Sequence, residues 1–448
     1  MQKYDMLKDS PGKSLLFFAL PMILGNLFQQ FYNMADSIIV AKFVGENALA
    51  AVGASYSLTT VFIMIAIGGG MGASVLTSQY MGAGEYKKMR TSVYTALISF
   101  FVISIVMLIF GIAINEKLLR TLNTPENILA DSVLYLKIYF IGLPFLFMYN
   151  VLSAVFNSLG KSQIPLYLLI FSSLLNIALD LYMVLALNMA VAGVAIATVI
   201  AQGISAVISF VILMKTLRNY KTSEGQPELY SATMLKRMVY IAIPSILQQS
   251  IVSIGMLLVQ SVVNVFGSSA LAGYSAGMRI ESICIVPMIA TGNAISTFTA
   301  QNLGASQTKR VKSGYHAGYG IIIAFATLIC VIIALFHNQI ISSFIDPESG
   351  AEAFAVGSSY LKFMGYFFAL IGFKAITDGV LRGSGDMIIF TAANLVNLGI
   401  RVFVAFHFAP IWGIQAVWYA VPMGWATNYL ISFSRYLTGN WSRKDIMS

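Results

Sequence analysis

Four polar side chains that can supply oxygen ligands fall inside apolar stretches of the sequence: Asp36, Asn176, Asp180 and Thr198. A carboxylate in such a stretch is costly to bury unless it is protonated, paired or bound to a cation. Two carboxylates with amide and hydroxyl oxygens suit Na⁺, whereas two close carboxylates without a metal share a proton. The sequence therefore predicts a site for a coupling cation. The same oxygens can bind H⁺ or Na⁺.

Spacing indicates how these groups meet. Asn176 and Asp180 are four residues apart and share one face if their segment is a helix. Thr198 joins them if the following helix packs alongside. The structural alternative is that Asn and Thr only hydrogen-bond between helices, as they often do in membrane bundles. Two acids in apolar segments favour the cation site, because such acids are rarely structural alone.

The elements that must position these residues are membrane helices. The chain has 448 residues, is 58% hydrophobic and only 10% charged, and apolar windows of about twenty residues recur along it, each long enough to cross a bilayer. This composition predicts an all-α polytopic protein, since short alternating segments typical of a barrel are lacking. We expect twelve spans, at 14–41, 49–80, 91–114, 127–155, 163–187, 191–214, 232–265, 270–302, 313–336, 351–380, 386–408 and 412–436.

The loops predict orientation and organisation. Lys and Arg residues gather in alternate loops, which the positive-inside rule places in the cytoplasm together with both termini. The cell inner membrane is the expected location. A long polar segment with Gly and Pro separates two halves, so we expect an N-lobe at 1–218, a cytoplasmic connector at 219–231 and a C-lobe at 232–448.

The two halves repeat one another. FVGENALAAVGAS from Phe43 returns as VFGSSALAGYSAG from Val265, and TSQYMGAGEYKKMR from Thr77 returns as TAQNLGASQTKRVK from Thr299. An even number of spans per half gives both halves one orientation. Substrate sites in such repeats tend to lie near the membrane midplane.

The repeat also shows where the halves stop matching. YLK at Tyr135 returns at Tyr360, and LLNIALD returns as LVNLGIR, which sets Asp180 opposite Arg401. Asp36 falls opposite an apolar position of the second half. Only the first half therefore holds both deeply placed acids.

Other function classes lack support. The net charge of +9 is spread over short loops, which disfavours a nucleic-acid partner. GYSAG at Gly273 to Gly277 matches a nucleophile-elbow pattern, but that pattern needs a preceding strand and a histidine partner, and here it begins a membrane helix instead. No Walker A or HExxH motif occurs, and Cys284 and Cys330 lie in apolar segments. We expect no enzyme activity and no cofactor beyond the coupling ion.

Further polar residues have weaker signals. Lys374 and Asp378, four apart, are expected to pair, and with Glu281 they lie near predicted span ends, where long side chains reach the interface. Glycines around Gly68 are expected to permit close helix approach. Candidates for a substrate cavity are aromatic, amide and Met residues that suit large cations, although plain packing is the alternative: Gln29, Tyr32, Met34, Tyr135 and Asn150.

These motifs resemble the multidrug and toxic compound extrusion family, whose members exchange cationic compounds for H⁺ or Na⁺ through two six-helix lobes in a V-shaped arrangement. The marks are the helix from Pro21 to Asp36, FVGENALAAVGAS, TSQYMGAGE with its echo, and NSLGKSQIP. The resemblance implies alternating access with bending of the first helix at Pro21, and a monomer embedded in lipid that binds small organic cations.

Within this family the chain looks most like the DinF-like branch. That branch has its cation site in the N-lobe, with an Asp, an Asn and Asp pair and a Thr that match Asp36, Asn176, Asp180 and Thr198, and with a tyrosine nearby that matches Tyr135. The NorM branch also uses C-lobe acids, where this chain has Val252 and Ile371. The alternatives are a lipid-linked saccharide flippase of the same superfamily, for which the acidic residues are the wrong charge, and an ion channel.

Overall fold

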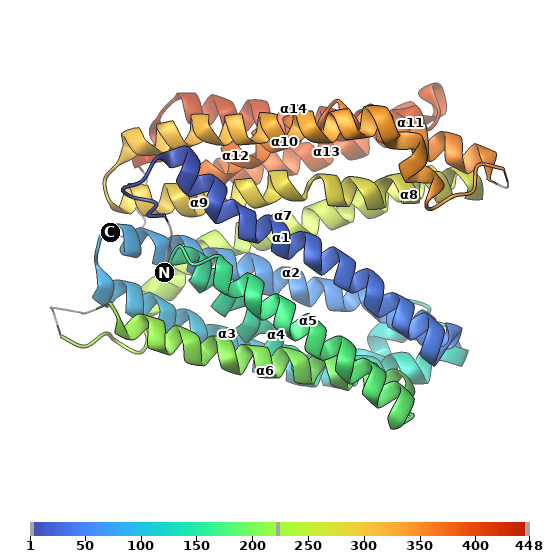
Figure 1. Ribbon diagram of the computed structural model, residues 1–448, viewed down its shortest axis with the longest axis horizontal. Coiled ribbons are helices and arrows are strands. Elements are labelled where there is room, and N and C mark those ends of the chain that lie inside the picture. The colour runs from blue at the N-terminus through green and yellow to red at the C-terminus, as the bar shows by residue number, and fades with distance from the viewer. Residues whose placement is uncertain (1–3, 221–224, 349, 444–448) are drawn as a thin grey trace. The chain divides into compact units, whose positions relative to one another are not determined.

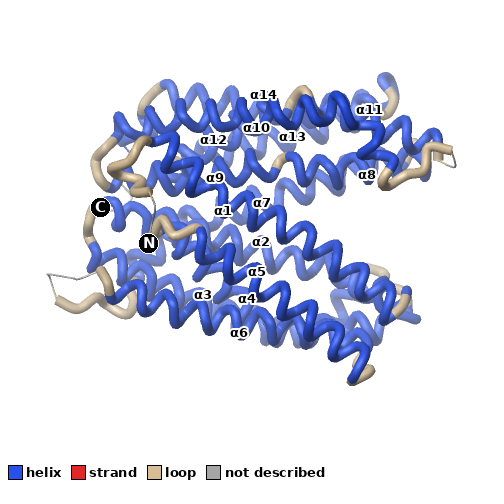
Figure 2. Tube along the Cα trace, in the orientation of Figure 1, coloured by secondary structure: helices blue, strands red, loops and turns tan. Residues whose placement is uncertain are grey.

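The computed structural model describes residues 4–220, 225–348 and 350–443, which form 14 α-helices and no strand (Figures 1 and 2). The helices are α1 Pro11–Ile39, α2 Glu46–Gly82, α3 Tyr86–Thr121, α4 Glu126–Ser158, α5 Gln163–Leu181, α6 Ala190–Arg218, α7 Ala232–Asn264, α8 Ser268–Cys284, α9 Val286–Gly304, α10 Thr308–Ser342, α11 Ala351–Gly365, α12 Phe368–Ser384, α13 Met387–Trp412 and α14 Gln415–Leu437.

The predicted all-α membrane fold is confirmed. Among the described residues, ten stretches are long and apolar enough to cross a membrane, or up to eleven when α11 and α12, bent by 52°, count as one broken span. The helices α8 and α9 together form one of these stretches. The remaining predicted span corresponds to α14, whose 23 residues reach about 35 Å. It is less apolar because it packs largely against α12 and α13 rather than facing lipid on all sides.

Contacts group the chain into two compact units, which we call unit 1 and unit 2. Unit 2 is Leu24–Ile246, and unit 1 combines Met1–Ile23 with Leu247–Ser448. The boundaries of these units lie within α1 and α7, two residues after Pro21 and Pro244. The connector at 219–231 stays a prediction, and its residues 221–224 lie outside the described part. Proline removes one backbone hydrogen bond and crowds the preceding turn, so each boundary falls where its helix is weakest.

Within unit 2, α4 is the central helix, because α2, α3 and α6 all pack against it and α5 packs against α6 (Figure 1). The glycines of α2 allow a further close approach, as predicted. A Cβ at Gly72 would lie 2.3 Å from the carbonyl oxygen of Met238, and one at Gly68 would lie 2.7 Å from the backbone of Ile246. Side chains larger than hydrogen would therefore force the first half of α7 away from α2.

Candidate functional site

Three helices of unit 2 carry the four residues predicted to bind a cation. Asp36 lies on α1, Asn176 and Asp180 lie one turn apart on α5, and Thr198 lies on α6, which packs against α5. Asn176 and Asp180 are buried, whereas Asp36 and Thr198 are half-buried. The packing of α6 alongside α5, on which the predicted position of Thr198 depended, is therefore present.

Both acid-bearing helices end in a wide turn that begins two to four residues after the acid. A π-helical segment at Val40–Val44 follows α1, and another at Tyr182–Ala186 follows α5. The two segments contact each other, and one valine of each is buried in the same apolar cluster, against which Tyr135 packs. Irregular turns of this kind are frequent at functional sites because they redirect nearby backbone groups. Here they hold the ends of α1 and α5 together.

The four side chains meet in one cluster. The carboxyl groups of Asp36 and Asp180 lie within hydrogen-bonding distance of each other. With its amide oriented to satisfy its neighbours, Asn176 donates to Asp180 Oδ2 at 3.3 Å and accepts from the backbone N–H of Thr198 at 3.1 Å. The hydroxyl of Thr198 donates to the carbonyl oxygen of Val194 at 3.0 Å, which leaves its lone pairs available as a ligand.

The cluster is acidic and lacks a basic partner. Within the described part of the chain, no Lys or Arg forms an ion pair with Asp36 or Asp180, and one oxygen of each carboxyl is buried without a hydrogen-bond partner. Two carboxyl groups hydrogen-bond only if one carries a proton, and otherwise a cation must offset their repulsion. The described residues contain no group of three His, Cys, Asp or Glu side chains suited to a metal.

Two of the predicted cavity residues belong to this cluster and three do not. Tyr32, one turn before Asp36, hydrogen-bonds to Asn176, and Tyr135 lies near both carboxyl groups. In contrast, Gln29 donates to Asn33 Oδ1 at 2.9 Å. Met34 is 46% exposed, and Asn150 donates to the carbonyl of Leu146 on its own helix at 2.8 Å.

Unit 1 contains a second buried cluster at the repeat positions. The hydroxyl of Tyr360, the counterpart of Tyr135, donates to the carboxylate of Glu281, and Arg401, the counterpart of Asp180, lies near enough to attract that carboxylate. The prediction that Glu281 lies near a span end was wrong, since Glu281 is 8% exposed and its span continues through α9. The repeated YLK motif was the signal that could have identified this cluster.

A network on α12 corrects another expectation. Lys374 and Asp378 form the predicted pair, with Nζ and Oδ2 2.9 Å apart, but both are buried and do not reach the interface. Asn394 accepts from Lys374 at 3.2 Å, and Ser432 donates to Asp378 at 2.7 Å. Helices α13 and α14 supply these partners, so packing encloses the pair from outside its own helix.

At the two positions where the NorM branch has C-lobe acids, this chain has no acid. Ile371 is apolar and 8% exposed, and the side chain of Val252 lies outside the described ones. Among the described residues, the buried acids of unit 1 are instead Glu281 on α8, Asp378 on α12 and Asp386 just before α13, each with a basic neighbour.

Comparisons with known proteins agree with this architecture. A model of the MatE family matches residues 21–182 and 244–407, two blocks that each begin at a proline. The chain is 29% identical over 450 residues to the probable multidrug resistance protein YpnP of Bacillus subtilis (strain 168), covering 100% of both. It is 28% identical over 457 residues to the probable multidrug resistance protein YoeA of the same organism, covering 98% of this chain and 96% of that one.

A solved structure has the same fold. It is described as the outward-facing conformation of a multidrug resistance MATE family transporter of the MOP superfamily, and it superposes with a TM-score of 0.87 at 22% identity over 98% of each chain. The family model covers most of the chain and the helices are those of a polytopic membrane protein. The chain therefore belongs to the MatE family of membrane transport proteins and is not an enzyme.

Proposed function

We propose that this protein is a secondary antiporter that exports organic, mostly cationic compounds in exchange for H⁺ or Na⁺. Two relatives are named as probable multidrug resistance proteins. The observation that carries the ion-coupling part is the pair of adjacent carboxyl groups of half-buried Asp36 and buried Asp180, which have no basic partner among the described residues. Such a pair is stable only with a proton or a cation bound, so its occupancy follows the ion gradient.

In this proposal α1 transmits the binding event. Pro21 and Asp36 lie on the same continuous helix, about 22 Å apart along its axis. A cation or proton removes the repulsion between Asp36 and Asp180 and draws the end of α1 toward α5. Pro21 lacks a backbone donor and gives α1 a point at which to bend. Bending narrows the drug-binding space in the lobe that holds the acids, and alternating access follows.

We also propose the cell inner membrane as the location, with both termini in the cytoplasm. Basic loops such as Lys87 to Arg90 and Lys309 to Lys312 then all lie on the cytoplasmic side. A single chain suffices for this mechanism, because one unit supplies every group of the cluster.

The test is ethidium transport in proteoliposomes under a separately imposed Na⁺ or pH gradient. Asp36→Asn should reduce transport to background under both gradients while the protein still inserts and purifies as a folded monomer. The matched control is Asp131→Asn, which removes one exposed carboxylate on α4 and should transport normally. Full activity of Asp36→Asn would refute the coupling role, and ion flux that never saturates would indicate a channel.

A further inference from the structure

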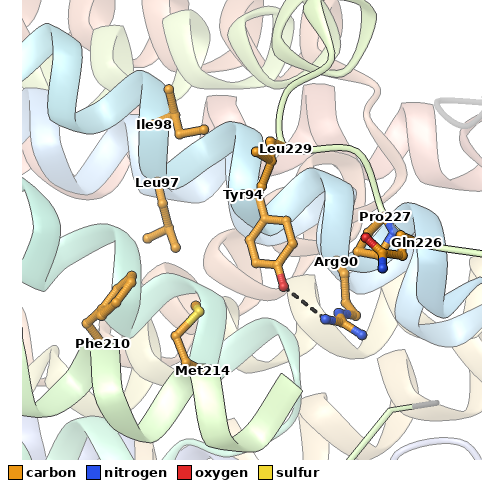
Figure 3. Close-up of a pocket in the computed structure, with 9 residues that line it drawn as sticks. All are labelled: Arg90, Tyr94, Leu97, Ile98, Phe210, Met214, Gln226, Pro227 and Leu229. Atoms are coloured by element: carbon orange, nitrogen blue, oxygen red, sulfur yellow. Dashed lines mark hydrogen bonds between the residues drawn. The ribbon is translucent and has the colours of Figure 1, made fainter. Parts of the chain in front are cut away.

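A groove opens on unit 2 between the first turns of α3, the last turns of α6 and the chain segment that precedes α7. Its volume is about 720 Å³, and Figure 3 shows its lining side chains. We call it the Arg90 groove. The lining residues used below are Arg90, Tyr94, Leu97, Ile98, Phe210 and Leu229.

Packing explains why the groove exists. The helices α3 and α6 both pack against α4, which holds them apart and leaves a channel between them. The chain segment before α7 covers one end of this channel. It is fastened to α3 by two hydrogen bonds, from the backbone N–H of Glu228 to Thr91 Oγ1 at 3.1 Å and from that of Ser231 to Thr95 Oγ1 at 3.0 Å. The groove is therefore built from three fixed segments.

One end of the groove is cationic. Arg90 donates to the hydroxyl of Tyr94 at 3.0 Å (Figure 3), but its Nε–H is buried without a partner. A guanidinium presents donors in a planar fork that matches phosphate oxygens. Lys215 and Arg218 lie in the last turn of α6. Glu85, the residue before α3, is paired with Lys88, with the two charged atoms 2.7 Å apart. The covering segment carries an acid, Glu228, next to the lining residues Pro227 and Leu229.

The other end of the groove is apolar and open. Ile98 and Phe210 lie on membrane-spanning helices and are each 42% exposed, as expected of apolar side chains that contact lipid. Ile98 lies eight residues after Arg90 on α3, about 12 Å deeper along the helix axis. The groove thus places a phosphate-binding group at the end of a span and apolar walls below it, the order of groups in a phospholipid.

We propose that the Arg90 groove binds one anionic phospholipid of the adjacent leaflet. The guanidinium of Arg90 contacts the phosphate, and an acyl chain lies along Leu97, Ile98 and Phe210. Basic pockets between membrane helices recognise anionic head groups in this way. The bound lipid fills the space under Leu229 and supports the segment that leads into α7, so it ties the connector between the halves to α3 and α6. The proposed lipid site depends on neither transport nor ion coupling.

Native mass spectrometry of the full chain in mild detergent tests the proposal, with phosphatidylglycerol and phosphatidylcholine offered as competing lipids. The wild type should retain one phosphatidylglycerol in preference to phosphatidylcholine. Arg90→Gln should lower that preference about fivefold or more, since each basic residue near a lipid head group contributes that order of affinity. The matched control is Arg120→Gln, which removes an exposed arginine from the other end of α3 and should change nothing.

A second variant avoids reliance on Arg90. Leu229 is 71% exposed, so Leu229→Asp leaves the helices intact while placing a carboxylate at the mouth of the groove, and it should also expel phosphatidylglycerol. Equal retention by Arg90→Gln and Arg120→Gln, or normal retention by Leu229→Asp, would overturn the proposal. Displacement of the lipid by millimolar inorganic phosphate would overturn it too, because the groove would then be a site for soluble anions.

Discussion

The two units bury matching clusters of opposite character. In unit 2, Tyr135 lies beside Asp36 and Asp180, and the described residues give these acids no basic partner. In unit 1, the repeat counterparts are Tyr360 and Arg401, and here the acid, Glu281, has a guanidinium nearby. One cluster is balanced from within the protein, whereas the other needs a cation or proton from outside.

The same contrast recurs between α5 and α12. In each helix an acid follows its partner by four residues, but the partner is neutral Asn176 in α5 and charged Lys374 in α12. A buried acid with a permanent internal cation already has its charge balanced and has little reason to exchange ions. The acid beside an amide can bind and release one. From this difference we infer that the burial of an acid does not by itself indicate ion coupling, and that the charge of its neighbours matters as well.

Asn176→Lys tests the comparison most directly, because it places a lysine four residues before the acid in α5, as in α12. The ammonium should pair with Asp180 and displace the coupling ion, so ethidium transport should fall to background under both gradients. Proteoliposome assays measure this, with insertion and monodispersity checked in parallel.

The matched control for that variant is Asn176→Met, because the Met side chain has nearly the same volume as that of Lys but carries no charge. Met removes one ligand, and we expect transport to fall by about tenfold, the effect of one lost hydrogen bond to a charged group. Transport by Asn176→Lys at or above that of Asn176→Met would contradict the inferred role of charge.

Asp378→Asn tests the other side of the comparison. It leaves the ammonium of Lys374 buried without its carboxylate, and breaking a buried ion pair costs about 3–5 kcal/mol. Thermal unfolding of the purified protein should show a clearly lower Tm, whereas Asp36→Asn should not lower it. The added change Lys374→Met removes the unpaired charge and should restore most of the stability. An unchanged Tm for Asp378→Asn alone would show that the pair is not structural.

Much of this architecture could be predicted from the sequence. Hydropathy predicts the helices because lipid excludes unpaired backbone groups, and the spacing of Asn176 and Asp180 predicts their shared face. The proximity of Asp36 to Asp180 needs contact between α1 and α5, which no local pattern encodes. It entered the prediction only through the resemblance to a family.

The remainder depends on tertiary packing. Hydropathy locates Lys374 and Asp378 near the end of a span, but only the side chains of α13 and α14 show that both are enclosed. The π-helical turns after the acids have no sequence signature, because one extra residue per turn is set by the contacts that it makes. The unit boundaries at Pro21 and Pro244 likewise follow from contacts, although both prolines are visible in the sequence.

Thr198→Val tests whether the Thr198 hydroxyl is an ion ligand of the acidic cluster, because it removes one oxygen at nearly constant side-chain volume. If that hydroxyl is an ion ligand, the apparent affinity for the driving ion should weaken by about fivefold, equivalent to about 1 kcal/mol. The measurement is the dependence of transport on Na⁺ and, separately, on pH. Thr198→Ser keeps the hydroxyl and should behave like the wild type. A loss seen with both variants would assign Thr198 to helix packing.

Glu281→Gln should have the smallest effect on transport, and it tests whether the cluster of unit 1 is silent. The Gln carbonyl can still accept from the Tyr360 hydroxyl, so the hydrogen bond survives while the charge is lost. Arg401 then loses its acid, and a modest fall in Tm is expected. Transport per folded protein should nevertheless stay close to wild type under both gradients, because in our proposal the driving ion binds at Asp36 and Asp180. Loss of transport in a folded Glu281→Gln protein would instead show that the cluster of unit 1 also takes part in ion coupling. The inferred contrast between the two clusters would then be wrong.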